Sequence, residues 1–279
     1  MSFNKVLTSL AVSTCLFMLS ACSGSPSSRE VNPKLISSAI VGGAKVISSD
    51  LISKTTVAIL ISSFDRNHVE SQYLCTGSLL RSGVILTAAH CVPPSDKHYD
   101  TRMYVVFTSD LDNLSDSDIR LVTDQVVHPK FGQSGPMGED SNDIALLKYP
   151  GSFPQGYRAA RLLPNDSLLK PKLTVTLAGY GLNDGITKAT DNQLRKVDVI
   201  LGQSFGDTEI ILDQSNGKGA CHGDSGGPAF VTIKGSLFLW GVISRGLGDD
   251  NCNSNGVYTK INSQHEFIDS ALIKLGFRP

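Results

Sequence analysis

One serine of this chain stands in a setting suited to nucleophilic chemistry. Ser225 lies in the stretch 221–228, which reads Cys-His-Gly-Asp-Ser-Gly-Gly-Pro, with Gly223, Gly226 and Gly227 around it. Glycine lets the backbone turn tightly and aim successive N–H groups at one point, as stabilisation of an oxyanion requires. A loop between strands uses the same residue types, so this stretch alone fits either a nucleophile or a turn.

A serine hydroxyl becomes a useful nucleophile only beside a base that another group orients. Two stretches supply candidates for both roles. His90 follows the apolar run that begins at Val84, and Asp143 precedes the apolar residues 144–147. The candidate base, acid and nucleophile therefore occur in the order His90, Asp143, Ser225.

These three stretches and several others resemble the trypsin/chymotrypsin serine endopeptidases, and the resemblance covers nearly everything after Ala39. A whole series of segments matches the family in the right order, which makes chance agreement improbable. Besides the three stretches around His90, Asp143 and Ser225, they are 40–43 (Ile-Val-Gly-Gly), 75–79 (Cys-Thr-Gly-Ser-Leu), 128–131 (His-Pro-Lys-Phe) preceding the aspartate, 177–181 (Leu-Ala-Gly-Tyr-Gly) and 256–260 (Gly-Val-Tyr-Thr-Lys).

The resemblance implies a mechanism for the triad. His90 would take the proton of Ser225 as its hydroxyl attacks a carbonyl and would then return the proton to the leaving amine, while Asp143 orients the imidazole. The N–H groups of Gly223 and Ser225 would bind the oxyanion. Ser244 matches the family serine beside the aspartate.

The resemblance also implies a substrate-binding surface. Arg245 and Gly246 would present backbone to an extended peptide, and Arg245 stands where a tryptophan is usual, which puts the apolar subsite in doubt. Gly219 matches the floor of the primary pocket, where trypsin-like enzymes carry aspartate, and Gly246 and Gly256 match its walls, with His222 at the mouth. We expect a roomy, neutral pocket that prefers large apolar residues. Two acidic residues in a nearby loop could add charge: Asp249 and Asp250.

Activation by proteolysis is a further implication of the resemblance. A cut before Ile40 would create an amino group that turns inward and pairs with Asp224, and such a buried pair sets the backbone around the nucleophile. Ala39 precedes the cut, where many family zymogens carry Arg or Lys. Trypsin-like self-activation is therefore not indicated, and we expect a separate activating protease.

The cysteines indicate an oxidising compartment. Two of the six lie in the N-terminal segment, and the other four can pair in three ways. Zinc ligation is the rival interpretation, but the Cys-x-x-Cys and His-x-x-x-His spacings are missing, so we expect no metal. The resemblance selects two disulfides: Cys75 with Cys91, and Cys221 with Cys252.

The first 39 residues are typical of an export and processing segment. Lys5 and an apolar run to Leu19 predict an export signal over 1–22, too short to span a membrane. Its end resembles a bacterial lipobox, which would lipidate Cys22, with Ser23 favouring the outer membrane; a plain cleaved signal is the alternative. Residues 23–39 read as a Ser- and Pro-rich tether and propeptide. We expect an exported protein of the bacterial envelope or periplasm, or one secreted after processing.

The composition indicates an ordinary globular protein, with 279 residues and a formal net charge of −1. This charge favours neither nucleic acid nor an anionic membrane surface as a partner, and we expect a monomer without a cofactor that acts on proteins or peptides. An acidic run at 110–118 lies where some family members bind calcium. It lacks the pattern of a helix-loop-helix calcium site, so a solvated loop is the favoured interpretation.

Short apolar runs separated by Gly, Pro, Asn and Asp predict an all-β fold. Such runs occupy 56–61, 84–87, 103–107, 173–178, 196–201, 229–233 and 237–243. The resemblance narrows the class to two six-stranded antiparallel β-barrels within a protease domain at 40–279, at about 40–160 and 161–261. Helical spacing predicts one C-terminal helix over about 262–275, packed on the second barrel.

Three function classes follow, and an exported serine endopeptidase made as a zymogen is the one we favour. The alternative is a catalytically silent binding or adhesion protein of the same family, because intact residues do not prove turnover. An esterase is disfavoured, because enzymes with a nucleophile elbow carry Ser, Asp and His in that order and alternate strands with helices.

Overall fold

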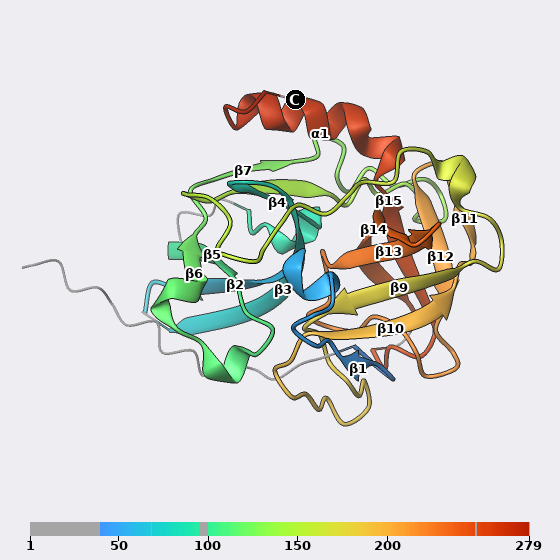
Figure 1. The fold of residues 1–279 in the computed structure, drawn as a ribbon, viewed down its shortest axis with the longest axis horizontal. Helices are drawn as coiled ribbons and strands as arrows, with labels where there is room; N and C mark the ends of the chain where they lie inside the picture. The colour runs from blue at the N-terminus through green and yellow to red at the C-terminus, as the bar shows by residue number, and fades with distance from the viewer. Residues whose placement is uncertain (1–39, 68, 95–99, 249, 279) are drawn as a thin grey trace, which may run out of the picture. The chain divides into compact units, whose positions relative to one another are not determined.

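The computed structural model describes residues 40–67, 69–94, 100–248 and 250–278 (Figure 1). The chain divides into two compact units, 1–34 and 35–279, and every described residue belongs to the second. The predicted export signal, Cys22 and the propeptide at 23–39 lie outside the described residues, as does Asp249.

The first antiparallel sheet is built from the N-terminal half of the domain. Its strands are β2 (Thr56–Phe64), β3 (Glu70–Arg81), β4 (Val84–Thr87), β5 (Asp100–Val106), β6 (Ile119–Leu121), β7 (Asp124–Val127) and β8 (Ala145–Lys148). They lie in the order β6-β5-β2-β3-β4-β8-β7. Only residues 122–123 separate β6 from β7, so one kinked segment pairs with both ends of the sheet and closes it.

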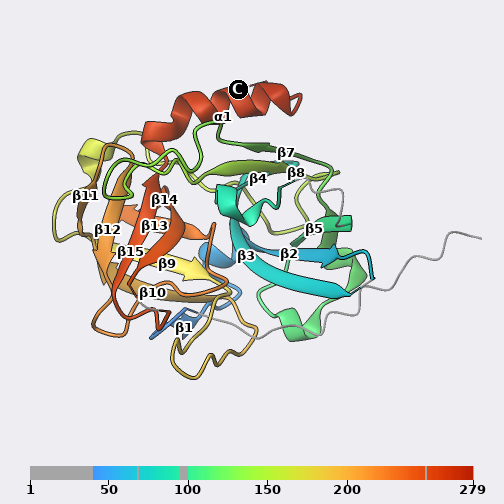
Figure 2. The same ribbon diagram turned by 180° about the vertical axis from the view of Figure 1, so that it is seen from behind.

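The second antiparallel sheet closes in the same way. Its strands are β1 (Ala44–Lys45), β9 (Thr174–Gly179), β10 (Arg195–Ile200), β11 (Gln203–Phe205), β12 (Glu209–Asp213), β13 (Pro228–Ile233), β14 (Ser236–Leu247) and β15 (Asn255–Lys260). The order is β1-β10-β9-β13-β14-β15-β12-β11, and residues 201–202 join β10 to β11. Figure 2 shows β12, β14 and β15 from the other side.

The all-β prediction is therefore confirmed. Within the described residues, each sheet has six strands when its kinked segment counts as one, and the two-residue β1 adds to the second. The apolar runs were good predictors because fully buried strands need apolar residues on both faces. Strand β4 is buried along its whole length and has the predicted bounds.

The C-terminal helix is also confirmed, but its packing differs from the expectation. A 3₁₀ turn (Asn262–Gln264) leads into α1 (His265–Lys274), whose buried residues include Phe267 and Ile268. The helix packs on β8 of the first sheet instead of on the second barrel, and Phe267 contacts the ring of His128. Lys148 of β8 donates to the carbonyl oxygen of Leu275 and so holds the end of the helix there. No helix in the described part of the chain has both the length and the hydropathy needed to cross a membrane.

Candidate active site

The turn that carries Ser225 is built around two glycines with left-handed backbone angles. Gly223 has φ +94° and Gly226 has φ +79°, which L side chains rarely adopt. A Cβ on Gly226 would lie 1.9 Å from Thr87 Oγ1 and 2.5 Å from Thr76 O. The turn thus lies directly against β3 and β4, and no side chain fits at position 226.

The backbone N–H groups of this turn differ in whether they donate a hydrogen bond. Those of Asp224, Gly226 and Gly227 each donate to a backbone carbonyl oxygen, at 2.8–3.0 Å. Those of Gly223 and Ser225 donate to no acceptor within the described residues. Two unused donors that flank a serine are what an oxyanion hole requires.

A hydrogen-bonded histidine and aspartate lie beside this turn. His90 belongs to the 3₁₀ turn Ala89–Cys91 after β4, and its Nδ1 lies 2.7 Å from Asp143 Oδ2. The backbone N–H of His90 donates to Asp143 Oδ1 at 3.0 Å, and Ser244 Oγ donates to Oδ2 at 2.6 Å. Burial alone would raise the pKa of Asp143, but the bonds and charge of His90 and the bond from Ser244 outweigh it and hold this pKa below its ordinary value.

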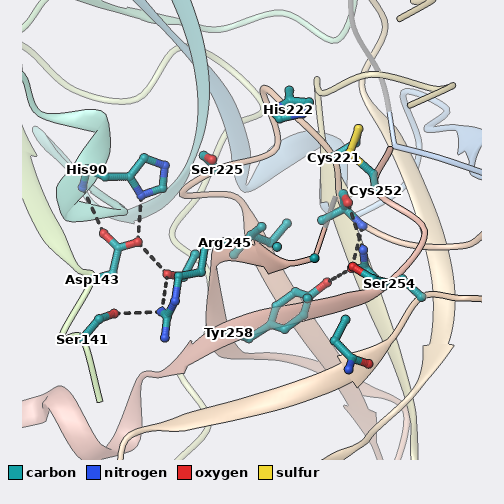
Figure 3. A pocket seen from close by; sticks show the side chains of 18 of the residues that line it. His90, Ser141, Asp143, Cys221, His222, Ser225, Arg245, Cys252, Ser254 and Tyr258 are labelled. Atoms are coloured by element: carbon teal, nitrogen blue, oxygen red, sulfur yellow. Dashed lines mark hydrogen bonds and ion pairs between the residues drawn. A yellow bond between two sulfur atoms is a disulfide. The ribbon is translucent and has the colours of Figure 1, made fainter. Parts of the chain in front are cut away.

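His90, Asp143 and Ser225 line one cavity of about 490 Å³ (Figure 3). In this view Ser225 lies across the imidazole ring from Asp143, so the ring stands between the carboxylate and the hydroxyl. Within the described residues no hydrogen bond joins Ser225 Oγ to His90 Nε2. Such contacts are often long in substrate-free sites and shorten in the Michaelis complex.

The segment that follows the expected cut lies next to the turn that carries Ser225. Ile40 is fully buried, and Val41 exchanges two backbone hydrogen bonds with Gly219, at 3.1 and 3.2 Å. Asp224 is also fully buried, and its carboxylate accepts from the N–H groups of Gly181 (2.5 Å) and Cys221 (2.8 Å). Burial raises the pKa of Asp224 to about 7 despite those two bonds.

Comparison with known proteins shows which family the chain belongs to. A family model described as Trypsin matches residues 46–268. The chain belongs to the trypsin family.

Relatives of this trypsin-family chain include larger proteins. Urokinase-type plasminogen activator of Gallus gallus is 30% identical over 224 residues, covering 71% of this chain and 51% of the relative. Vitamin K-dependent protein C of Rattus norvegicus is 30% identical over 242 residues, covering 76% and 48%. The chain thus spans about half the length of these curated relatives. A solved structure titled "HL collagenase" is 21% identical with a TM-score of 0.64, covering 86% of this chain and 100% of the other, which supports the fold alone.

Gln214 is the pocket residue that the sequence analysis missed. Its side-chain Oε1 accepts from the N–H of Ala220 at 3.1 Å and from the hydroxyl of Tyr258 at 2.7 Å, and its Nε2 donates to the carbonyl oxygen of Ala220 at 3.1 Å. A Cβ at Gly219 would lie 2.2 Å from Gln214 Cδ, and one at Gly256 would lie 2.4 Å from its Oε1. An amide therefore fills the space over the two glycines of the expected trypsin-family pocket.

The mouth of the pocket carries an exposed charged cluster. His222 Nε2 lies 2.9 Å from Asp250 Oδ1, and Lys188 Nζ lies 3.3 Å from Asp250 Oδ2. The nearby His222, followed by Lys188, holds the pKa of Asp250 below its ordinary value. Because all three side chains are exposed, water screens this cluster.

Two disulfides hold the site, in the pairing that the resemblance implies. Cys75–Cys91 joins β3 to the turn of His90, and Cys221–Cys252 joins the turn that carries Ser225 to the segment between β14 and β15. The described groups of His and Cys close enough to bind a metal are built on these same four cysteines. Their sulfurs are bonded to each other and so are not available as thiolate ligands.

The remaining predicted residues lie on β14. Ser244 contacts Asp143 as described, and Gly246 faces open space. The side chain of Arg245, which stands in place of the usual tryptophan and put the apolar subsite in doubt, pairs with Glu209 and Ser141. Glu209 is fully buried, and the sequence analysis did not single it out, since a lone glutamate at a strand start is typical of an exposed residue.

Proposed function

We propose that this chain is a serine endopeptidase in which Ser225 Oγ attacks the carbonyl carbon of a peptide bond. His90 Nε2 takes the hydroxyl proton, and the N–H groups of Gly223 and Ser225 bind the oxyanion. His90 then gives the proton to the leaving amine, and water repeats the sequence to hydrolyse the acyl-enzyme. Asp143 stabilises the imidazolium. The observation that carries the proposal is the pairing of His90 with Asp143 in one cavity with Ser225 and two unused N–H donors.

The substrate is proposed to bind as an extended strand along the end of β14. Strand β13 pairs with β14 only as far as Val242, whereas β15 continues along β14 to Leu247. One edge of residues 244–247 thus has no strand neighbour within the described sheet. An extended peptide can pair there through its main chain while its side chains enter pockets, which is the logic of strand addition.

The primary pocket is proposed to be neutral. Gly219 supplies no charge at the floor, and the group that lies over it is the amide of Gln214. A buried lysine or arginine side chain of the substrate would lack a counter-charge there and would bear the cost of desolvation. A peptide library in which Arg or Lys dominates before the cut would contradict this proposal.

Activation is proposed to follow a cut between Ala39 and Ile40 by another protease. The support is that Ile40 and Val41 already lie beside Gly219 and that the buried Asp224 has no cationic partner within the described residues. The same cut would separate the protease domain from Cys22, so a lipid-anchored precursor would release a soluble enzyme. Active enzyme that starts at Ile40 but stays with membranes would contradict the release.

The deciding experiment is covalent labelling by a fluorophosphonate probe. Three proteins are compared: the full-length precursor, protein that starts at Ile40, and the Ser225→Ala variant of the latter. Labelling of the wild-type protein that starts at Ile40, and of neither other protein, supports both the nucleophile and the switch. Folded protein that starts at Ile40 and takes no label contradicts the endopeptidase and favours the catalytically silent binding protein.

A further inference from the structure

The side chain of Arg245 is engaged in the interior, on the side of the site where Asp143 lies. Its Nη1 donates to Glu209 Oε1 at 2.8 Å and its Nη2 donates to Oε2 at 2.9 Å, a forked ion pair. Glu209 is fully buried, and the Arg245 side chain is 28% exposed. Removing charges from water is costly, so a pair of this kind persists only with excellent geometry and further hydrogen bonds. Those further bonds lead to the catalytic aspartate.

We propose that Arg245, held by Glu209, is a positioning residue that orients Asp143 through Ser244. Ser244 Oγ lies 3.1 Å from Arg245 Nη1 and 2.6 Å from Asp143 Oδ2. A guanidinium has no lone pair to accept with, so Ser244 must accept from Arg245. The single hydroxyl proton of Ser244 is then directed to Asp143. The inference rests on the proposed endopeptidase function and adds a residue to its machinery.

The same ion pair also fixes the loop that leads into Asp143. Glu209 accepts from the N–H groups of Asp140 (3.0 Å) and Ser141 (3.3 Å) and from Ser141 Oγ (2.8 Å). Arg245 donates to Ser141 Oγ at 2.8 Å (Figure 3) and also to the carbonyl oxygen of Gly138. Within the described residues, the side-chain polar contacts of the pair thus fall on the loop, on Ser244 or within the pair itself.

A reciprocal set of bonds runs from the loop to the second sheet. The Asp140 carboxylate accepts from the N–H groups of Asp207 (3.0 Å) and Thr208 (2.6 Å) and from Thr208 Oγ1 (2.8 Å). The loop needs such support, because Asp140 and Asn142 have φ of 58° and 53°, which is strained for residues with a side chain. Asp143 follows directly, so its place depends on these contacts between the two barrels.

The charges of Arg245 and Glu209 should affect the protonation of His90 in opposite directions, which a role in packing alone would not produce. Arg245 contacts the Ser244 hydroxyl that donates to Asp143, whereas the side-chain contacts described for Glu209 fall on Arg245 and on Asp140 and Ser141. The cation of the pair is therefore connected to Asp143 and His90 more directly than the anion is. Removing the cation leaves the site more negative, which stabilises the imidazolium of His90 relative to the neutral ring. Removing the anion leaves the cation uncompensated and destabilises that imidazolium. Asp140 and Asp143 are charged groups on this side, Lys260 acts through its charge on Asp140, and all four variants keep these three residues.

The experiment measures kcat, KM and the pH dependence of kcat/KM for protein that starts at Ile40 and for Arg245→Met, Arg245→Lys, Glu209→Gln and the double variant Arg245→Met with Glu209→Gln. Loss of one directed bond lowers kcat of Arg245→Met about tenfold, with little change in KM. The acidic limb of the pH profile of kcat/KM moves to higher pH by on the order of half a unit in Arg245→Met, and to lower pH by a similar amount in Glu209→Gln. Arg245→Lys keeps the charge but loses the fork, so its limb stays near that of wild type while its kcat falls.

The controls separate positioning from loss of structure. Arg102→Met removes an exposed arginine of β5 that pairs with Asp100, and it should change neither kcat nor the acidic limb. Active sites are counted with the fluorophosphonate probe, so a poorly folded variant lowers the count and leaves the limb in place. Glu209→Gln and the double variant leave no unpaired buried carboxylate and guard against simple unfolding.

Two results would overturn the inference. One is a wild-type kcat and acidic limb in every variant, and the other is a lower active-site count with no opposite shifts of the limb. If wild-type protein shows no hydrolysis that depends on Ser225, the proposed function fails instead. The inference is then decided by NMR titration of His90 in the Ser225→Ala background, where the same opposite shifts are expected without turnover.

Discussion

Gly219 and Gln214 together decide what the primary pocket can hold. The sequence indicates the missing charge at Gly219, because that residue lies at a fixed distance from Ser225 in a recognisable stretch. It does not indicate Gln214, whose place over the two glycines depends on how the segment between β12 and Cys221 folds back. His90, Asp143 and Ser225 were identifiable because each stands in a distinctive local stretch. The direction of a long side chain such as Arg245 is set by partners remote in sequence.

Introducing Gly219→Asp alone should therefore fail to produce a trypsin-like enzyme. Its Cβ would meet Gln214 Cδ at 2.2 Å, so the carboxylate and the amide compete for one space, and we expect a lower melting temperature and slower cleavage of all substrates. Gly219→Asp with Gln214→Ala should have room for the carboxylate and raise the preference for Arg and Lys at least about tenfold. Peptide library profiling measures the shift, with Gln214→Ala as the control. Equal Arg and Lys preference in the single and double variants would contradict this role of Gln214.

At the scale of elements, the site depends on short irregular segments between well-predicted strands. Apolar runs identify β4, β9 and β13 because burial on both faces demands them. The short strands β6 and β11 lack such a run and owe their form to pairing with strands already in place. The helical spacing of apolar residues predicts α1 itself. It does not predict the surface on which the helix packs, which belongs to the first sheet.

The Cys75–Cys91 disulfide should stabilise the turn that holds His90 as well as the fold. The bond closes a loop with a sequence separation of 16, so chain entropy predicts a loss of about 3 kcal/mol in the free energy of unfolding for Cys75→Ala with Cys91→Ala. Urea denaturation in the Ser225→Ala background measures this loss without self-digestion. The same pair of substitutions in active protein should slow fluorophosphonate labelling. Unchanged stability together with an unchanged labelling rate would show that the bond is dispensable.

At the scale of the whole molecule, the chain near Ile40 links the N-terminal side of the domain to the second sheet. Strand β1 pairs with β10, Val41 pairs with Gly219, and the side chain of Ile40 is part of the second apolar core. The sequence indicated the cut and the partner Asp224 by resemblance alone. How completely that carboxylate is buried depends on Gly179 and Gly181, which leave no room for side chains beside it.

The uncut precursor should consequently lose stability as the pH rises. Its residue 40 nitrogen is an amide, so the buried Asp224 has a folded-state pKa of about 7 against an ordinary value of 3.8. The folded state binds this proton more tightly than the unfolded state does. The contribution of Asp224 protonation to the free energy of unfolding is therefore complete below about pH 4. It declines by about 1.4 kcal/mol per pH unit up to about pH 7. Urea denaturation at several pH values measures the free energy of unfolding of the Ser225→Ala precursor and of the same precursor with Asp224→Asn. The difference between the two free energies isolates this decline.

Cleavage should abolish that decline, because the new ammonium of Ile40 would pair with Asp224 and bring its pKa back down. Protein that starts at Ile40 should then keep its stability between about pH 4 and 7, and lose it only when the ammonium deprotonates above its ordinary pKa of about 8. Here Asp224→Asn should be destabilising at neutral pH, whereas in the precursor it should be neutral or stabilising. An identical pH slope in the cut and uncut proteins would mean that the amino group does not reach Asp224, and the switch would have to act through another contact.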